Sequence, residues 1–335
     1  MAGTLFGFPF NEELFSYNWK NAPDPVGTAL VNSGAVVVNG EIASQISQGS
    51  NIYTVPFYNV IGGEEQNYDG ATDIVPTETD GGFQSGIVYG RAKAWTARDF
   101  IADYHKADPM AAIAAQVQNY WSKQRQARII GILTAVFGIT GGDSADQYTK
   151  DWVANHSTTL TTALTETSIN DACVQACGDL ATGNFGLAIM HSTVAKNLAN
   201  KELLEYRKYT DAEGIQRQLN LADINGLTVV ISDQVPTTGT TSKKYTTYVL
   251  GNGAIQFAQA SVQHPVESDR DPYKNGGEEV LITRLRETLL PNGFTYTAAT
   301  ADGQSPTNAE LFKSAKYAPI FDPKCIAMAQ IVSAG

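Results

Sequence analysis

Cysteine is scarce in this chain of 335 residues, in which only Cys173, Cys177 and Cys325 occur. Three cysteines do not form a disulfide framework, and an odd number suits a reducing compartment. Cys173 and Cys177 lie four residues apart on one face of an expected helix, a spacing that two metal ligands could use. No histidine or further cysteine is close enough in sequence to complete a four-ligand set. We therefore expect buried apolar cysteines and no metal site.

Positive charge is also in short supply. Lysine and arginine together number 23 and the acidic residues 34, which gives a formal net charge of -11. A protein that holds nucleic acid by its phosphates needs clustered cations, so nucleic-acid binding is not expected as the main function. The charge does not exclude a protein that encloses nucleic acid without holding it.

Targeting and membrane segments are missing as well. Residues 1–15 contain neither a basic segment nor an apolar run, so we expect no secretory signal. The most apolar stretch, residues 129–139, is too short to cross a bilayer and contains Thr134 and two glycines. We expect no membrane partner. The hydrophobic content of 43% and the length allow one large domain or two to three modest ones.

Motifs of catalysis and cofactor binding are not found. None of the four histidines has metal-ligand spacing, and neither a phosphate-binding glycine loop nor a G-x-S-x-G elbow occurs. Residues 269–271 and 278–279 resemble a calcium loop, but Tyr273 stands where an oxygen ligand is needed, so we expect a polar loop. His191 ends a predicted strand ahead of a helix, and a hydrogen-bonded structural histidine is favoured there. A hydrolase site around His191, within residues 168–260, is the alternative; we predict no enzyme, no catalytic residue and no cofactor.

A long helix is the strongest feature that is present. Asp108 suits the N-cap and Pro109 the first helical position. No acidic residue and no further proline follow before Gly138, which is a suitable C-terminal stop. Apolar residues recur at helical spacing, which predicts one buried face; they are Met110, Ile113, Val117, Tyr120, Trp121, Ile130, Leu133 and Phe137.

An acidic connection precedes this helix. Residues 51–90 contain no lysine or arginine, and they include Glu64, Glu65, Asp69 and Asp73 between two strand-like runs, 52–60 and 86–95. Pro56 marks the first run as an edge strand. A connection of this length is functional or mobile in most compact domains. It is interpreted either as a solvated loop or as a protruding hairpin that docks on another chain.

The cations of the long helix form a basic island in an acidic protein. Lys123, Arg125 and Arg128 either lie on a solvated face, contact a neighbouring chain or face nucleic acid. We take the loop acids and nearby cations as candidates for a subunit interface; the full set is Glu64, Glu65, Asp69, Asp73, Arg91, Lys93, Lys123, Arg125 and Arg128.

The remaining pattern predicts an α+β block followed by strands. We expect short helices at 96–106, at 168–180 with Ser168 opening a capping box, at 192–206 with Ser192 as the cap, and after Thr307. We expect strands at 36–38, 185–190, 227–232, 279–289, 294–297 and 325–332. Residues 245–250 and 254–258 are predicted to form a hairpin around Gly251-Asn252-Gly253.

The order of these parts resembles the major capsid proteins of tailed bacteriophages with the HK97-type fold. The likeness is carried by Asp108-Pro-Met-Ala-Ala-Ile-Ala-Ala and the helix after it, and by Asn225-Gly-Leu-Thr-Val-Val-Ile-Ser-Asp233. It continues through Arg284-Leu-Arg286, Pro291-Asn-Gly-Phe294 and Ser305-Pro-Thr-Asn-Ala309. The order of these motifs along the chain, more than any single one, carries the resemblance.

The resemblance implies an architecture and a role. It implies an N-terminal arm at 1–49, an E-loop at 50–95, a peripheral domain at 96–165 and 256–335 with the spine helix 109–138, and an axial domain at 166–255. Pentamers and hexamers would tile an icosahedral shell around double-stranded DNA in the virion, after assembly in the host bacterial cytoplasm. Implied partners are the chain itself, a separate scaffolding protein, a portal protein and decoration proteins.

One departure and one alternative qualify this picture. Some family members cross-link subunits through an E-loop lysine, and because residues 51–90 contain no lysine we expect no such isopeptide bond. Because Met1 nearly adjoins the arm, we expect no long cleaved scaffolding segment. An encapsulin-like compartment that holds a cargo enzyme is the alternative within this fold.

Overall fold

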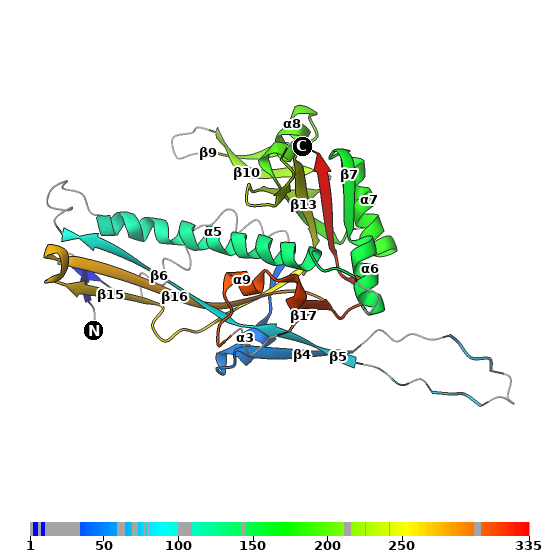
Figure 1. Ribbon diagram of the computed structural model, residues 1–335, viewed down its shortest axis with the longest axis horizontal. Helices are drawn as coiled ribbons and strands as arrows, with labels where there is room; N and C mark the ends of the chain where they lie inside the picture. The colour runs from blue at the N-terminus through cyan, green and yellow to red at the C-terminus, as the bar shows by residue number, and fades with distance from the viewer. Residues whose placement is uncertain are drawn as a thin grey trace.

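The computed structural model describes the chain in separate segments. They are residues 3–5, 8–10, 34–58, 64–68, 73–76, 78, 81–99, 109–141, 145–181, 183–210, 216–224, 226–240, 242–297 and 303–334. Helix α5 (Pro109–Phe137) runs along the longest axis, with a sheet on either side and a ribbon extending from one end (Figure 1). The predicted long helix is confirmed, and Asp108, its expected N-cap, lies outside the described residues.

The lower sheet is built around one long strand. β16 (Glu278–Pro291) pairs with β6 (Tyr89–Arg98) along one side, and with β15 (Val266–Asp271) and β14 (Ile255–Ala260) along the other. β3 (Val36–Val38) extends the sheet parallel to β14. Odd-numbered residues of β16 from 281 to 289 are buried, since one face of the strand lies under α5. The predicted strand at 279–289 is confirmed.

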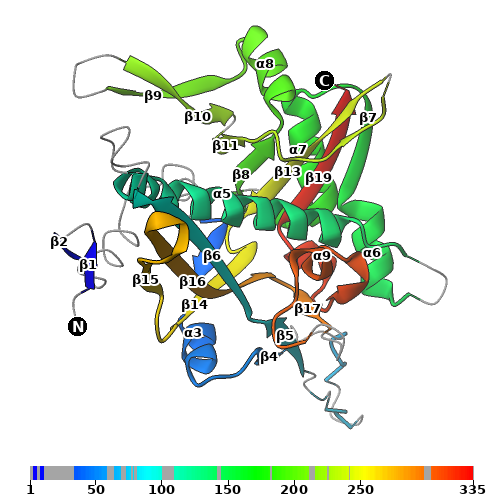
Figure 2. The same cartoon turned by 60° about the vertical axis from the view of Figure 1, so that its left-hand side comes forward.

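The upper sheet has eight strands with helices against it (Figure 2). Its order is β7 (Ser157–Ala163), β19 (Met328–Ala334), β13 (Lys244–Gly251), β8 (Phe185–Met190), β11 (Leu227–Ile231), β10 (Gln216–Ile224) and β9 (Glu205–Thr210), and β12 (Thr237–Thr238) pairs with β13. α7 (Glu166–Cys177) and α8 (Ser192–Asn200) share its core. β7 and β19 lie outside residues 166–255, so the sheet includes two strands from beyond the residue range expected for the axial domain.

A protruding ribbon and several short elements complete the fold. β4 (Ile52–Tyr58) and β5 (Gly81–Ile87) pair only with each other among the described strands, and Pro56 therefore lies on an edge strand as predicted. α3 (Gly40–Ser47) precedes the ribbon, and β1 (Gly3–Leu5) pairs with β2 (Phe8–Phe10). α9 (Asn308–Leu311) contacts α5, and α6 (Gln147–Asn155) contacts β18 (Tyr317–Pro319), which pairs with β17 (Phe294–Tyr296). The capping box of Thr307 and Glu310 is present at α9, as predicted.

Two helix boundaries in the upper part differ from the prediction. The N-cap of α7 is Thr165, whose hydroxyl accepts a hydrogen bond from the Ser168 N–H at 3.2 Å, so the helix starts before Ser168. It ends at Gly178, where φ is +58°. α8 is capped by His191 and not by Ser192. It ends at Asn200 and not near Tyr206, which already belongs to β9. Competing cap residues one to three positions away account for these errors.

The largest differences between the sequence-based predictions and the structure concern the pairing of strands. β13 and β14 occupy the predicted positions but do not form a hairpin, because β13 joins the upper sheet and β14 the lower. β17 is the strand expected at 294–297; it follows a turn at Gly293, where φ is +84°, and pairs with β18. Residues 96–98 continue β6 where a helix was predicted, and residues 100–106 lie outside the described part. Residues 269–271, expected as a loop, belong to edge strand β15.

The backbone passes between the two sheets at three neighbouring points, which we call the waist. The passages lie between α6 and β7, between β13 and β14, and ahead of β19. His156 Nδ1 lies 2.7 Å from the Met328 carbonyl oxygen, and the Gly251 N–H donates to the Ala327 carbonyl at 2.7 Å. The larger apolar core crosses here as well and includes Tyr248 of the upper sheet and Phe294 below it.

Candidate subunit-interface surfaces

Part of the basic island is committed to a buried acid of the same chain. Glu287 on β16 is fully buried, and its Oε1 accepts from Arg128 Nη2 at 2.5 Å and from the Tyr89 hydroxyl at 3.3 Å. Its Oε2 accepts from Arg125 Nε and Nη2 at 3.3 and 3.2 Å. Burial raises the pKa of Tyr89 well above its ordinary value, and the Glu287 charge raises it further. These four residues form what we call the Glu287 cluster, which joins α5 to β16 and β6.

This cluster corrects the expectation for two arginines. Arg128 has 2% of its side chain exposed, so it cannot serve as a contact to a neighbour or to DNA. Arg125 keeps 34% exposure but points its guanidinium at Glu287 and over the Phe257 ring. A buried carboxylate is stable only when cations and donors surround it, which is why both arginines turn inward.

Arg91 also has partners within the subunit. Its Nη2 donates to the Pro306 carbonyl and to Asn308 Oδ1, both at 2.8 Å, which ties β6 to the start of α9. Burial lowers the pKa of the guanidinium somewhat, in part offset by the attraction of Tyr89. Because Arg91 is half-buried, it contributes to a surface mainly by holding the 305–308 segment in place.

Lys93 and Lys123 are different, because both are exposed. No ion pair involves either one within the described part of the chain. Lys123, on α5, lines a groove of about 410 Å³, and Lys93 lies on β6 two residues before Trp95, which also lines it. Of the five predicted cations, these two are available for contact with another molecule.

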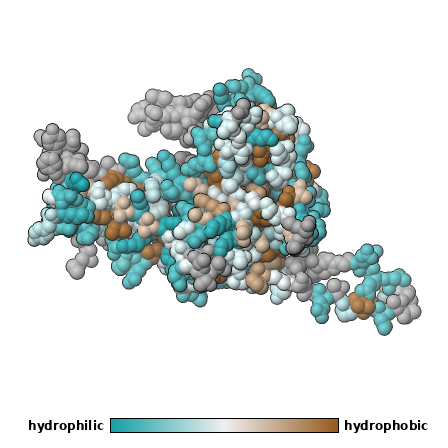
Figure 3. Space-filling view, in the orientation of Figure 1, coloured by the Kyte–Doolittle hydropathy of each residue, from teal (hydrophilic) through white to brown (hydrophobic). Residues whose placement is uncertain are grey.

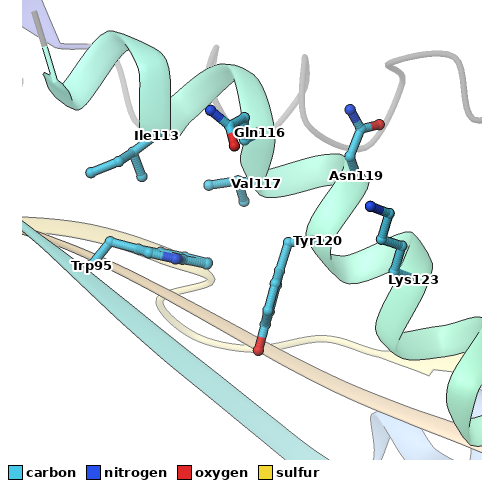
Figure 4. Close-up of a pocket in the computed structure, with 7 residues that line it drawn as sticks. All are labelled: Trp95, Ile113, Gln116, Val117, Asn119, Tyr120 and Lys123. Atoms are coloured by element: carbon cyan, nitrogen blue, oxygen red, sulfur yellow. The ribbon is translucent and has the colours of Figure 1, made fainter.

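Aromatic and aliphatic side chains form the walls of this groove. Trp95 rises from β6, while Ile113, Val117 and Tyr120 point down from α5 (Figure 4). The Trp95 and Tyr120 rings meet edge to face with centroids 5.5 Å apart. Gln116, Asn119 and Lys123 form the polar rim. The groove is therefore an apolar slot with a basic edge.

The acidic loop lies at the opposite end of the molecule. It stands away from the body, and its surface is mainly hydrophilic with a small hydrophobic group (Figure 3). Glu64, Glu65 and Asp73 are exposed, whereas Asp69 lies outside the described residues. Ile74 and Val75 are 67% and 66% exposed.

A side-chain clamp closes the tip of this loop. The Gln66 amide accepts from the Val75 N–H at 2.8 Å and donates to the Val75 carbonyl at 2.6 Å, as a paired strand residue would. Two hydrogen bonds from one side chain fix the spacing of the two loop limbs. Ile74 and Val75 are thereby presented together beside Asp73 and Glu78.

The histidine and cysteine positions have structural roles. His191 Nδ1 accepts from the Thr193 N–H at 3.1 Å and caps α8, which confirms the structural interpretation. Hydrogen bonds from Ser192 lower the pKa of the neighbouring Asp233. Cys173 and Cys177 are buried as predicted, and burial raises their thiol pKa values to about 12 and about 11. Thiols with such pKa values are poor nucleophiles at neutral pH.

The described residues offer neither a metal-ion cluster nor a membrane-spanning helix. They contain no cluster of three or more His, Cys, Asp or Glu side chains suited to a metal ion. Among them there is also no helix with the length and hydropathy needed to cross a membrane.

Comparisons with known proteins agree with the architecture. No protein-family profile matches the chain. It is 25% identical over 312 residues to the major capsid protein of Bacillus phage SPP1, covering 90% of each chain. The capsid of Ralstonia phage GP4 matches with a TM-score of 0.52 and 13% identity over 77% of this chain and 83% of that one. The cyanophage Pam1 capsid matches with a TM-score of 0.52 and 11% identity over 85% of each.

These similarities identify the fold as the HK97-like fold of phage capsid subunits, in the α+β class as predicted. The resemblance to major capsid proteins of tailed phages is likewise confirmed, since it now extends over nine-tenths of the sequence.

Sequence reasoning missed Glu287, Trp95 and Gln66. A signal for Glu287 was available, because the period of two in β16 puts it on the same face as Leu285 and Leu289. An acid on an apolar strand face predicts a buried partner. No sequence pattern announces the Gln66 clamp, which depends on the approach of two loop limbs.

Proposed function

We propose that this protein is the major capsid protein of a tailed phage, whose copies assemble into pentamers and hexamers of an icosahedral shell around double-stranded DNA. The observation that carries the proposal is the HK97-like fold over most of the chain, together with 25% identity to a major capsid protein along 90% of the sequence. Heterologous contacts that close into rings suit such a shell. Many weak contacts per subunit then add up through multivalency.

Each part of the chain has a proposed place in that shell. Residues 1–49 form an arm, and residues 50–95 an extended loop that contacts a neighbouring subunit. Residues 96–165 and 256–335 form the peripheral domain around α5, and residues 166–255 the axial domain, with β7 and β19 completing its sheet. The acidic residues Glu64, Glu65, Asp69 and Asp73 and the lysines Lys93 and Lys123 are the proposed contact residues between subunits.

Further partners are proposed on the same basis. A scaffolding protein would direct assembly in the bacterial cytoplasm, a portal protein would occupy one vertex, and decoration proteins would bind the finished shell. The net charge of -11 suits a wall that encloses DNA without immobilising it.

The test is assembly of the purified chain with and without its scaffold, followed by electron microscopy and sedimentation. We expect closed particles tens of nanometres across, and nucleic acid in particles from the native source. A species that stays monomeric in every condition would refute the proposal. Protein cargo in place of DNA would indicate a compartment of the encapsulin type.

The role that we propose for this protein is structural and not catalytic. His191 is already used to cap α8, and it is the residue on which a hydrolase would depend. The variant His191→Ala should therefore assemble normally, with only a small loss of stability. A hydrolytic activity that disappears in His191→Ala would contradict this view.

A further inference from the structure

Three thiols lie where the upper sheet meets the waist. Cys173 and Cys177 are on α7, and α7 packs against the short helix η5 (Pro323–Cys325) just ahead of β19. η5 therefore belongs to the backbone passage that enters β19, one of the three passages of the waist. Cys325, the last residue of η5, is exposed, whereas Cys173 and Cys177 are buried. The fold thus brings cysteines from distant parts of the sequence to one place, with one thiol open to solvent.

Cys177 lies directly against the backbone beside Cys325. Its Sγ–H donates to the Ile326 carbonyl oxygen at 3.6 Å, and Ile326 follows Cys325 in the chain. Burial raises the pKa of the Cys177 thiol to about 11, and the charge of a deprotonated Cys325 contributes to the rise. One thiol can affect the pKa of another only when the two sulfurs are close. Cys177 and Cys325 are therefore neighbours in space although they are far apart in sequence.

The alternative pair is less suited to a covalent bond. Cys173 and Cys177 are one turn apart in α7, where the Cβ atoms of residues i and i+4 are about 5–6 Å apart. A disulfide needs Cβ atoms about 3.5–4.5 Å apart, so this pair can join only if the helix is distorted. Cys177 is the last residue of α7 and Cys325 the last residue of η5, so their side chains can approach without unwinding a helical turn.

We propose that Cys177 and Cys325 form a disulfide bond when the protein meets an oxidant, and that this bond fastens α7 to the waist. The oxidant is a low-molecular-weight disulfide such as oxidised glutathione. The exposed Cys325 thiol gives its proton to water, and its sulfur attacks the reagent, whose S–S bond breaks and releases one glutathione. Cys177 then loses its proton and attacks the Cys325 Sγ of the mixed disulfide, which releases the second glutathione. Each cysteine sulfur is oxidised by one electron, and the reagent gains the two electrons.

The bond forms slowly and persists once formed. Burial and the neighbouring Asp322 charge raise the pKa of Cys325, so little thiolate is present at neutral pH. Sulfurs with raised pKa values are also poor leaving groups, which protects the finished bond from reduction. A reducing compartment keeps the thiols free, and an oxidising medium joins them. In a shell, the bond strengthens the waist only after the particle leaves its host; this consequence rests on the proposed function, whereas the bond itself does not.

Counting thiols in the unassembled subunit tests the bond directly. The purified chain is incubated with oxidised glutathione, unfolded and labelled with a maleimide. The reduced chain carries three thiols, and we expect one, Cys173, to remain after oxidation, with a mass loss of two hydrogen atoms and a linked pair of peptides that contain Cys177 and Cys325. A reducing agent should restore all three. Three unreacted thiols, a stable glutathione adduct on Cys325, a link between Cys173 and Cys177, or dimers joined through Cys325 would each overturn the proposal.

Matched variants separate the bond from a general effect of oxidation. Cys173→Ala removes the third thiol and should oxidise like the parent chain, whereas Cys325→Ser removes the exposed partner and should keep both buried thiols. The bond closes a loop of about 150 residues, so the oxidised parent chain and oxidised Cys173→Ala should unfold at a urea concentration higher by about 1 M or more. Cys325→Ser should show no such shift.

Equal unfolding midpoints before and after oxidation of the parent chain would overturn the role of the bond in fastening α7 to the waist. Because the subunit is measured before assembly, a missing bond leaves the shell function standing. Failure of the chain to assemble would refute the shell function and leave the bond standing, so the two failures are distinguishable.

Discussion

The Glu287 cluster makes the sharpest prediction about stability. Replacing Glu287 by glutamine keeps the size of the side chain but removes its charge. Arg128 would then be a cation with 2% of its side chain exposed and no carboxylate to face. Arg125, with 34% exposure, can turn towards water and lose little. The loss is therefore dominated by Arg128, and breaking a buried pair in this way costs about 3–5 kcal/mol.

The matched control is Glu267→Gln on the edge strand β15. Glu267 pairs with Arg284, and the two side chains are 36% and 38% exposed. Exposed pairs of this kind contribute about 0–1 kcal/mol. The same chemical change should thus have a small effect there, although both acids lie on strands of one sheet.

Urea unfolding of the unassembled subunit, followed by fluorescence and circular dichroism, measures both variants. A double variant, Arg128→Met with Glu287→Gln, removes the orphaned cation and should be more stable than Glu287→Gln alone by about 1–3 kcal/mol. The reasoning is refuted if Glu287→Gln loses no more stability than Glu267→Gln, or if Arg128→Met gives no recovery.

Three further predictions concern single residues. Burial lowers the pKa of His156 below its ordinary value of 6.5, so the folded state binds fewer protons than the unfolded state. The free energy of unfolding should therefore fall as the pH drops below 6.5, by at most about 1.4 kcal/mol per pH unit. The variant His156→Gln should lose this pH dependence, whereas a substitution of the exposed His264 should keep it. Gly131→Ala gains about 1 kcal/mol of helix propensity but drives a methyl group into the Phe312 ring, so urea unfolding should show a net loss that Gly131→Ala with Phe312→Leu recovers; a stabilised single variant would contradict this. His191→Ala removes the acceptor of the Thr193 N–H and should cost about 1 kcal/mol, a value that equal unfolding midpoints would exclude.

Local features were predictable from the sequence where one physical preference dominates. Pro109 and the absence of any further proline before Gly138 defined α5, and Thr307 with Glu310 defined the cap of α9. The runs at 36–38 and 185–190 became strands at the predicted residues. In each case the deciding interactions lie within a few residues of one another.

Pairing between distant segments was not predictable in the same way. The turn around Gly251-Asn252-Gly253 is typical of a hairpin, yet β13 finds partners in β8 and β19, and β14 finds its own in β16. The choice depends on apolar contacts between segments that lie tens of residues apart, which no local preference records. For the same reason the basic island could be located but its partner could not, since Glu287 lies 159 residues beyond Arg128.

The waist has a mechanical consequence. Two bodies joined by a single linker can rotate about that linker. Three backbone passages that are hydrogen-bonded side by side resist both bending and twisting. Gly251 bonds to Ala327, and His156 contacts Met328, so a load on the upper body is shared among all three passages instead of stretching one. A subunit built this way would transmit pressure from inside a filled shell to its neighbours as a stiff plate, and local yielding would be left to the slender β4–β5 ribbon.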